Sequence, residues 1–259
     1  MNVQEYNSAA WDKEVEREIE WSVPVGSEII ERARGGDWSV VLTPIKSVPR
    51  EWFGDVRGRD VLCLASGGGQ QAPVLAAAGA NVTSFDNSAK QLEQDKSVVE
   101  RDNLEIRLEK GDAADLSRFP DESFDLIFHP VSNCFMPNLE PVWREAFRVL
   151  RRGGGAMLSG FHNSFFFIFD RTADQEQGIL RVKYSLPYSD LESLSKEERR
   201  KYTDADEPLA FGHTLEQQIG GQTAAGFLIS GFYEDYWSDE ATALNKYAPT
   251  YIATKAVKL

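Results

Sequence analysis

The chain has 259 residues, of which 42% are hydrophobic and 27% are charged, a composition typical of globular proteins. Its formal net charge of −13 disfavours binding to the phosphate backbone of nucleic acids, so we expect a small-molecule partner and no nucleic acid. No apolar run approaches the roughly 20 residues that a membrane-spanning helix needs, and the acidic first residues differ from a secretory signal, so we expect no membrane partner and a cytoplasmic location.

The first 52 residues predict a helical N-terminal cap. Helical spacing is clearest over residues 12–21, and Pro24, Pro44 and Pro49 interrupt the segment that follows. We therefore expect this part of the chain to pack as helices and connections beside the main sheet.

Strand and helix patterns alternate from residue 60 onward. The sequence predicts five strands, at residues 60–65, 81–86, 104–112, 124–129 and 155–161, of which the first is apolar enough to be buried. Helices are predicted between them, at residues 70–79, 88–101 and 139–150. Strands joined by helices need right-handed crossovers and form a parallel sheet that is covered on both faces. The fold class is therefore α/β, doubly wound and mostly parallel.

The regular pattern lapses over residues 162–212, where several phenylalanines precede a highly charged stretch. An insertion of this length is typical of a lid over a substrate. A helix at 214–226 and strands at 227–237 and 249–259 then bring the predicted sheet to seven strands. We expect one domain, made of a cap (1–52), a core (55–161), a lid (162–212) and the C-terminal part of the sheet (213–259).

A run of three glycines, Gly67, Gly68 and Gly69, separates the first predicted strand from its helix. Such a loop lets a ligand approach the backbone, and the helix N-terminus adds N–H donors. Asp86 ends the next strand, at the spacing of an acid that binds ribose hydroxyls. Gly67, Gly69 and Ala72 also fit the dinucleotide pattern G-x-G-x-x-G/A, so an NAD(P)- or flavin-dependent oxidoreductase is an alternative.

The stretch VLCLASGGG resembles the VLDLGCGTG of class I, Rossmann-like S-adenosylmethionine-dependent methyltransferases that act on small molecules. The resemblance continues through NVTSFDNSAKQL, GDAADLSRFPDESFDLIF and EAFRVLRRGGGAML and covers roughly residues 55–161. It implies S-adenosylmethionine as cofactor and methyl transfer to an O, N or C atom. Asp86 would bind the ribose, and Asp112 and Ala113 the adenine. The expected cofactor contacts are Ala65, Ser66, Gly67, Gly69, Gln70, Asp86, Asn87, Asp112, Ala113 and His129.

The chain departs from this family pattern at two positions. Cys63 stands where the family usually has an acid that helps to hold the cofactor's ammonium group, and Ala65 stands where it usually has a glycine. Backbone carbonyls near Ala65, or a side chain of the N-terminal cap, could take over the contact. The departures leave a second alternative, an S-adenosylmethionine-binding protein without transfer activity.

Histidine is the side chain best suited to remove a proton from a methyl acceptor near neutral pH. His129 ends the fourth predicted strand, at the edge of the sheet where ligands gather, and is the first candidate for the catalytic base. His162 follows the fifth strand and is the second candidate, while His213 follows the insertion. Each could equally be a buried histidine with a structural hydrogen bond.

On the substrate side we expect Asn133, His162, Tyr6 and Trp11. Several alternatives stay open, because Asn87 also suits a helix cap, Asp112 a turn and Trp11 a hydrophobic docking residue. The spacing of the histidines predicts no metal site, and the two cysteines predict neither a disulfide nor a zinc site. The sequence does not determine the acceptor or the oligomeric state.

Overall fold

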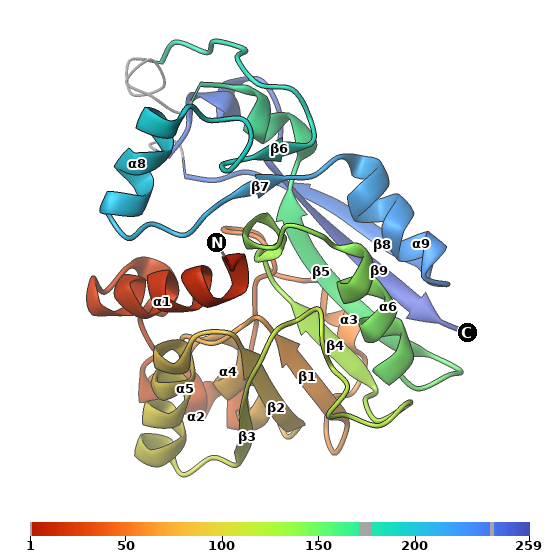
Figure 1. Ribbon diagram of the computed structural model, residues 1–259. Helices are drawn as coiled ribbons and strands as arrows, with labels where there is room; N and C mark the ends of the chain where they lie inside the picture. The colour runs from red at the N-terminus through yellow and green to blue at the C-terminus, as the bar shows by residue number, and fades with distance from the viewer. Residues whose placement is uncertain (1, 171–177, 239–240) are drawn as a thin grey trace.

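The computed structural model describes residues 2–170, 178–238 and 241–259. A seven-stranded sheet with the order β3-β2-β1-β4-β5-β9-β8 forms the centre of the molecule (Figure 1). Its strands, in chain order, are β1 (Asp60–Leu64), β2 (Asn81–Asp86), β3 (Ile106–Lys110), β4 (Leu126–His129), β5 (Gly155–His162), β8 (Leu228–Asp235) and β9 (Tyr251–Lys258).

The strands from β3 to β5 pair in parallel, and β9 runs antiparallel to both of its neighbours, β5 and β8. This confirms the α/β fold with a mostly parallel, seven-stranded sheet. The main helices are α1 (Val3–Glu16), α2 (Ser27–Arg34), α3 (Arg50–Phe53), α4 (Gln71–Ala77), α5 (Ala89–Asp102), α6 (Glu140–Val149), α8 (Lys196–Asp204) and α9 (Gly221–Ala224).

Each face of the sheet has its own hydrophobic core, because successive side chains of a strand point to opposite faces. Along β1, Val61 and Cys63 pack against the helices α2 and α4, with Ile30 and Leu75 fully buried. Leu62 and Leu64 face the other way, into a core that is built around Trp143 of α6. The predicted doubly wound arrangement is therefore present, with helices on both faces.

The N-terminal helix α1 spans Val3–Glu16, so it begins and ends earlier than residues 12–21, where the sequence pattern was clearest. It begins at Val3 because the Asn2 side chain accepts from the amides of Gln4 and Glu5 and caps the helix. In Figure 1 α1 lies beside α5, across the edge at which the parallel strands end. Asp12 of α1 accepts from the Ser88 hydroxyl (2.6 Å) and from the Lys90 amide (3.1 Å) at the start of α5. These bonds fix α1 over the ends of β1 and β2.

The insertion forms short elements above the same edge of the sheet (Figure 1). They are η3 (Ser164–Ile168), β6 (Tyr188–Ser189), α8 and β7 (Phe211–Gly212), and β6 pairs with β7 as a separate small sheet. Their own small core contains Phe167, Tyr188 and Leu194. Part of the predicted lid, residues 171–177, lies outside the described residues. None of the helices in the described ranges is long and apolar enough to cross a membrane.

After the insertion, the predicted helix at 214–226 is a π-helical turn, Glu216–Gly220, followed by α9. Here Trp143 of α6 donates its indole N–H to the Gln217 carbonyl (3.0 Å), and a side chain at Gly221 would strike the same indole. The close packing on Trp143 thus requires a glycine at the junction.

Candidate functional site

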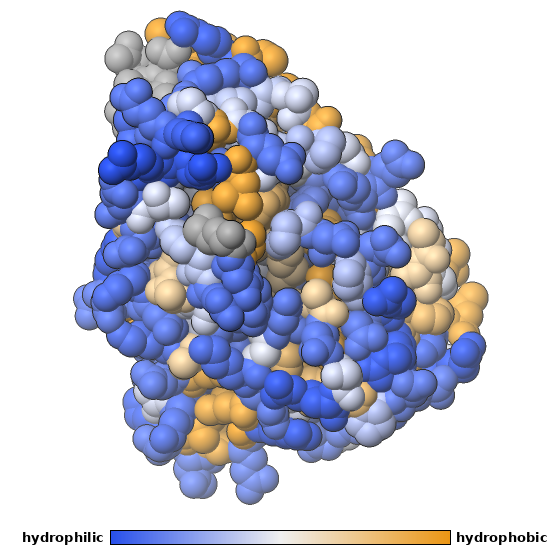
Figure 2. Space-filling view, viewed as in Figure 1, coloured by the Kyte–Doolittle hydropathy of each residue, from blue (hydrophilic) through white to orange (hydrophobic). Residues whose placement is uncertain are grey.

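A cavity of about 820 Å³ opens at the carboxyl ends of β1, β2, β4 and β5. Open parallel sheets usually bind ligands at this edge. Figure 2 shows the corresponding face of the molecule, where hydrophobic side chains gather in a central hollow surrounded by hydrophilic ones. The cavity walls come from the loop after β1, the ends of β2 and β3, helix α1 and the insertion.

The loop after β1 is held tightly against the end of β2 and the start of α5. The Gly67 amide donates to the Asp86 carboxylate (3.0 Å), and the Gly68 amide donates to the Gln91 carbonyl (2.9 Å). A Cβ atom on Gly67 would lie 2.7 Å from the Gln91 side chain, so this position has no room for one. Ala65 takes a left-handed conformation, with φ of 48°. Ala65, Ser66, Gly67 and Gln70 all line the cavity, as expected.

Gly69 does not line the cavity. It has a φ of 75°, and a side chain on it would strike Pro24 on the outer side of the loop. Its amide donates to Asp95, below the loop. Gly69, predicted as a cofactor contact, therefore lies in the turn of the loop and not in the cavity wall.

Asp86 is the central polar group of this half of the cavity. Its two carboxylate oxygens accept from the amides of Gly67 (3.0 Å) and Ser88 (2.8 Å), which leaves further lone pairs for a ligand. Burial raises the pKa of Asp86, while hydrogen bonds from these amides act in the opposite direction. A carboxylate fixed in this way can accept hydrogen bonds from two neighbouring hydroxyl groups.

The predicted adenine contacts, Asp112 and Ala113, and the predicted cofactor contact Asn87 lie near Asp86. Asn87, Asp112 and Ala113 all line the cavity, together with Phe85. Asp112 also accepts from the Ala114 amide (2.9 Å), so it is both a turn residue and a cavity residue. The Asn87 side chain exchanges two hydrogen bonds with Gln4 of α1, and Asn87 thus joins the end of β2 to the N-terminal helix.

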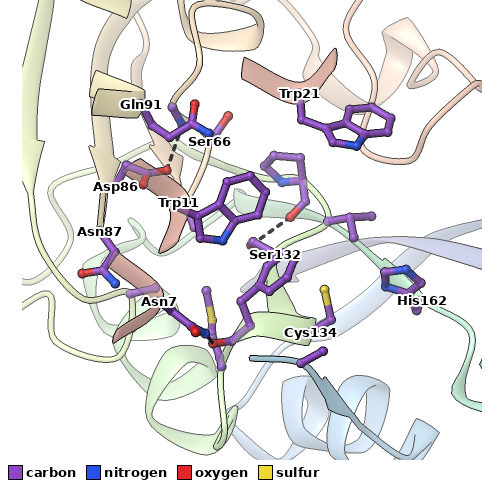
Figure 3. Close-up of a pocket in the computed structure, with 18 of the residues that line it drawn as sticks. Asn7, Trp11, Trp21, Ser66, Asp86, Asn87, Gln91, Ser132, Cys134 and His162 are labelled. Atoms are coloured by element: carbon purple, nitrogen blue, oxygen red, sulfur yellow. Dashed lines mark hydrogen bonds between the residues drawn. The ribbon is translucent and has the colours of Figure 1, made fainter. Parts of the chain in front are cut away.

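Two buried oxygens in this half form no hydrogen bond with any described residue, namely Ser66 Oγ and Gln91 Oε1. Ser66 and Gln91 are 5% and 4% exposed, and both line the cavity (Figure 3). The Gln91 amide nitrogen donates to Ser22 Oγ (2.8 Å), which fixes the orientation of the side-chain amide. Buried polar atoms normally have partners. These two oxygens fit a ligand that carries hydroxyl or ammonium donors.

Helix α1 closes the cavity from above. Trp11 lies between the Asp86 side and the His162 side of the cavity in Figure 3, and its ring meets Phe135 edge to face at 4.9 Å. Asn7 donates to the carbonyls of Phe135 (2.9 Å) and Leu209 (3.1 Å) and accepts from the Leu209 amide (2.9 Å). One side chain of α1 therefore holds both the loop after β4 and the insertion.

Tyr6, which we expected on the substrate side, does not line the cavity. Its hydroxyl donates to the Glu207 carbonyl in the insertion (3.0 Å). Tyr6 points outward from α1 and joins it to the insertion, whereas Trp11, on the inner side of the same helix, does line the cavity.

The far end of the cavity is aromatic and contains His162, the last residue of β5. The imidazole ring packs against Phe166 and Tyr251 with centroid distances of 4.5 Å, and against Phe167 at 5.2 Å. Trp237 also lines this end. The cavity thus has a polar half near Asp86 and an aromatic half near His162.

His129 and Asn133 do not lie where we expected them. His129 is fully buried and does not line the cavity. Its Nδ1 donates to the Leu64 carbonyl (2.9 Å), its Nε2 lies 2.6 Å from the Asn133 side-chain oxygen, and burial lowers its pKa. Asn133 is likewise buried and donates to Gln218 (2.7 Å), away from the cavity. In this structure His129 and Asn133 are therefore bonded to the protein interior, and neither lines the cavity.

His213 is structural as well, since its Nε2 donates to the carbonyls of Asn133 (3.1 Å) and Met136 (3.0 Å). No group of His, Cys, Asp and Glu side chains suited to holding a metal ion occurs in the described part of the chain.

Sequence reasoning missed several residues that shape the cavity, because each lies far from the glycine loop along the chain. They are Asn7, Trp21, Gln91, Cys134, Trp237 and Tyr251, with Asp95 below the loop. Asp95 had no direct signal in the sequence, since the substitutes expected for the missing acid at Cys63 were backbone carbonyls near Ala65 or a side chain of the N-terminal cap, and Asp95 lies on α5.

Known proteins of similar sequence are methyltransferases. A family model described as a methyltransferase domain matches residues 62–158. The uncharacterized methyltransferase YbaJ of Bacillus subtilis (strain 168) is 53% identical over 254 residues, which is 98% of this chain and 98% of that protein. The sterol 24-C-methyltransferase erg6 of Aspergillus fumigatus is 36% identical over 105 residues, but these cover only 39% of this chain and 28% of that protein.

Solved structures show the same fold at low sequence identity. An S-adenosylmethionine-dependent methyltransferase from Mesorhizobium loti aligns with a TM-score of 0.64 and 18% identity, over 81% of this chain and 95% of that one. A second, from Methanosarcina mazei, aligns with a TM-score of 0.54 and 16% identity, over 82% and 98% of the two chains.

Proposed function

The chain belongs to the class I S-adenosylmethionine-dependent methyltransferases, and on that premise we propose that it methylates an O, N or C atom of a small molecule held in the aromatic half of its cavity. The observation that carries the proposal is the continuity of one cavity from Asp86 to His162. Because the chain belongs to this family, we set aside the two alternative hypotheses for the glycine loop, an oxidoreductase and a non-catalytic S-adenosylmethionine-binding protein.

On the cofactor side, we propose that Asp86 accepts hydrogen bonds from the ribose and that Asp112 and Ala113 border the adenine. Ser66 and Gln91 would accept from the amino-acid tail, since both have buried oxygens that lack a protein donor among the described residues. When bound, the cofactor supplies an electrophilic methyl group on a sulfonium centre.

On the acceptor side, the protein's main task is to hold the acceptor atom in line with the methyl group at about 3 Å, because positioning alone can supply much of the acceleration. His162 lines this half and is the histidine that can reach a bound acceptor. We assign it the removal of a proton from a hydroxyl or ammonium acceptor, with Phe166 and Tyr251 fixing the ring orientation.

We also propose that α1 and the insertion together act as a lid. Both contribute side chains to the cavity wall, Trp11 from α1 and Phe166 and Phe167 from the insertion, and Asn7 ties the two together. Exclusion of water by such a lid would protect the reactive sulfonium.

We further propose that the protein is located in the cytoplasm, which cell fractionation would test. We also propose, from the negative charge of the chain, that it has no nucleic-acid partner, which a DNA-retention assay would test.

The test is transfer of a labelled methyl group from S-adenosylmethionine to a metabolite extract, with the wild type and the variants His162→Gln and His213→Gln. We expect labelled product with the wild type, a loss of turnover of about 10²-fold or more for His162→Gln if the acceptor loses a proton, and turnover within a few-fold of wild type for His213→Gln. If the protein binds S-adenosylhomocysteine but labels no metabolite, the proposed transfer reaction is wrong. If His162→Gln and His213→Gln have equal turnover, the proposed role of His162 is wrong.

A further inference from the structure

Asp95 of α5 is a buried carboxyl group that lies directly below the glycine loop. It is fully buried, accepts from the Gly69 amide at 2.7 Å and from the Ser84 hydroxyl at 2.6 Å, and has no direct place in the cavity wall. Burying a carboxyl group costs free energy unless hydrogen bonds or an opposite charge compensate for the lost contact with water. Among the described residues, its backbone partner is the Gly69 amide, in the loop that shapes the cofactor site.

Asp95 lies near Cys63, the position at which the family pattern has an acid and this chain does not. Cys63 on β1 stands where similar proteins usually have an acid, and it lies close enough to Asp95 for the carboxylate charge to raise the pKa of its already buried thiol. The thiol therefore stays neutral. The carboxyl group that β1 lacks is present instead on the neighbouring helix α5, close to Cys63.

We propose that Asp95 is a positioning residue of the cofactor site, which holds the glycine loop through Gly69 and supplies from α5 the negative charge that Cys63 does not provide. The inference rests on the proposed placement of the cofactor above that loop. The ionised form is the effective one, because a carboxylate accepts a hydrogen bond more strongly than a neutral acid and attracts the cationic cofactor.

This role makes cofactor binding depend on pH near neutrality. Burial raises the pKa of Asp95 to about 7, against the opposing effect of the hydrogen bonds from Ser84 and Gly69. The titratable groups that face it are Asp86, at the end of β2, whose charge raises the pKa further, and Cys63, on β1. A proton on Asp95 would weaken both the Gly69 bond and the attraction for the cofactor.

The sign of the effect on folding is opposite to the sign of the effect on binding. Because the pKa of Asp95 is higher in the folded chain than in the unfolded one, the contribution of Asp95 to stability falls as the pH rises through about 4 to 7. Cofactor affinity, in contrast, rises over the upper part of this range as the carboxyl group ionises. A purely structural carboxyl group would not produce these opposite trends.

The experiment is calorimetric measurement of S-adenosylmethionine affinity from pH 6 to pH 8 for the wild type, Asp95→Asn and Ser84→Ala, with Glu93→Gln, an exposed position on the same helix, as control. If cofactor binding lowers the pKa of Asp95 by about one unit, the affinity of the wild type rises about fivefold over this range more than that of Asp95→Asn. The ligand amine titrates in both proteins, so the difference between them reports Asp95 together with its electrostatic coupling to Asp86.

At pH 8 we expect Asp95→Asn to bind about tenfold more weakly than the wild type while melting at an equal or higher temperature. Ser84→Ala keeps the carboxyl group but loses the hydroxyl donor, so its profile should move to higher pH, and this variant tests the inference even if Asp95→Asn folds poorly. Identical pH profiles in the wild type and Asp95→Asn, an unmoved profile in Ser84→Ala, or weaker binding that merely follows a lower melting temperature would overturn the role of Asp95. If the wild type binds no S-adenosylmethionine at any pH, the proposed cofactor site itself fails.

Discussion

At the scale of single residues, the carboxylate of Asp86 connects the glycine loop to the ligand. Both of its oxygens accept from backbone amides, of Gly67 and of Ser88, before any ligand is bound. In Asp86→Asn the side-chain NH₂ would face one of these amides, donor against donor. We expect S-adenosylhomocysteine affinity to fall about 10- to 100-fold, measured by calorimetry. The exposed Asp55→Asn serves as control, and a variant at Asp86 that binds like wild type would contradict the assignment.

The buried His129 gives a prediction about stability rather than catalysis. Replacing it with Gln breaks its contacts with Leu64 and Asn133, so we expect a loss of about 2 kcal/mol and a melting temperature lower by roughly 4–8 °C. His162→Gln should instead lower turnover and leave the melting temperature nearly unchanged. The opposite pattern in calorimetry and activity assays would exchange the roles of the two histidines.

The same histidine predicts a pH dependence of stability. Burial lowers the pKa of His129 and of His213, so their unfolded forms take up protons that the folded forms do not. The stability they contribute is present above about pH 6.5 and is lost as the pH falls toward their folded pKa values. Between pH 7 and 5.5, His129→Gln should therefore lose less stability than the wild type in urea unfolding. An equal or steeper loss would count against this interpretation.

At the scale of elements, helix α1 is held over the cavity mainly by polar bonds. Asn7 contributes three of them, to Phe135 and to both backbone groups of Leu209. In Asn7→Ala we expect faster hydrogen exchange in the amides of Val3–Glu16, together with a higher KM for the acceptor, because the lid would open more often. Lys13→Ala, which breaks only an exposed ion pair of the same helix, is the matched control. Unchanged exchange in Asn7→Ala would remove α1 from the lid.

At the scale of the whole molecule, the sequence predicted what local patterns encode. Alternating strands and helices, the glycine loop and the spacing to Asp86 each depend on a short stretch of chain, and all of them were found in place. The placement of His129 was misjudged, although a local pattern indicates it. The period of a strand puts it on the same face as Ile127, under Trp143, rather than above the edge of the sheet.

In the acceptor half the sequence pointed to His162 but not to Trp237 or Tyr251, because this half is assembled from distant segments. His162, Phe166, Trp237 and Tyr251 meet only through the pairing of β5 with β9 and through the folding of the insertion. Asp95 reaches Gly69 from 26 residues away along the chain. Contacts of this kind depend on tertiary packing, which the spacing of residues in one sequence does not reveal.

Ligand binding should also stabilise the whole fold. At an S-adenosylhomocysteine concentration about 100 times its Kd, the free energy of unfolding rises by about 2.7 kcal/mol, which corresponds to roughly 5–10 °C in melting temperature. NADH at the same concentration should produce no shift, because the site is assigned to an adenosyl cofactor without phosphates. A thermal shift with NADH alone would return the glycine loop to dinucleotide binding.

The most direct test of the account is a crystal structure of the protein with S-adenosylhomocysteine. We expect the ribose hydroxyls within hydrogen-bond distance of Asp86, the adenine beside Asp112 and Ala113, and the sulfur facing the aromatic half that contains His162. A nucleoside bound elsewhere, or an occupied cavity in which Asp86 makes no contact with the sugar, would contradict it.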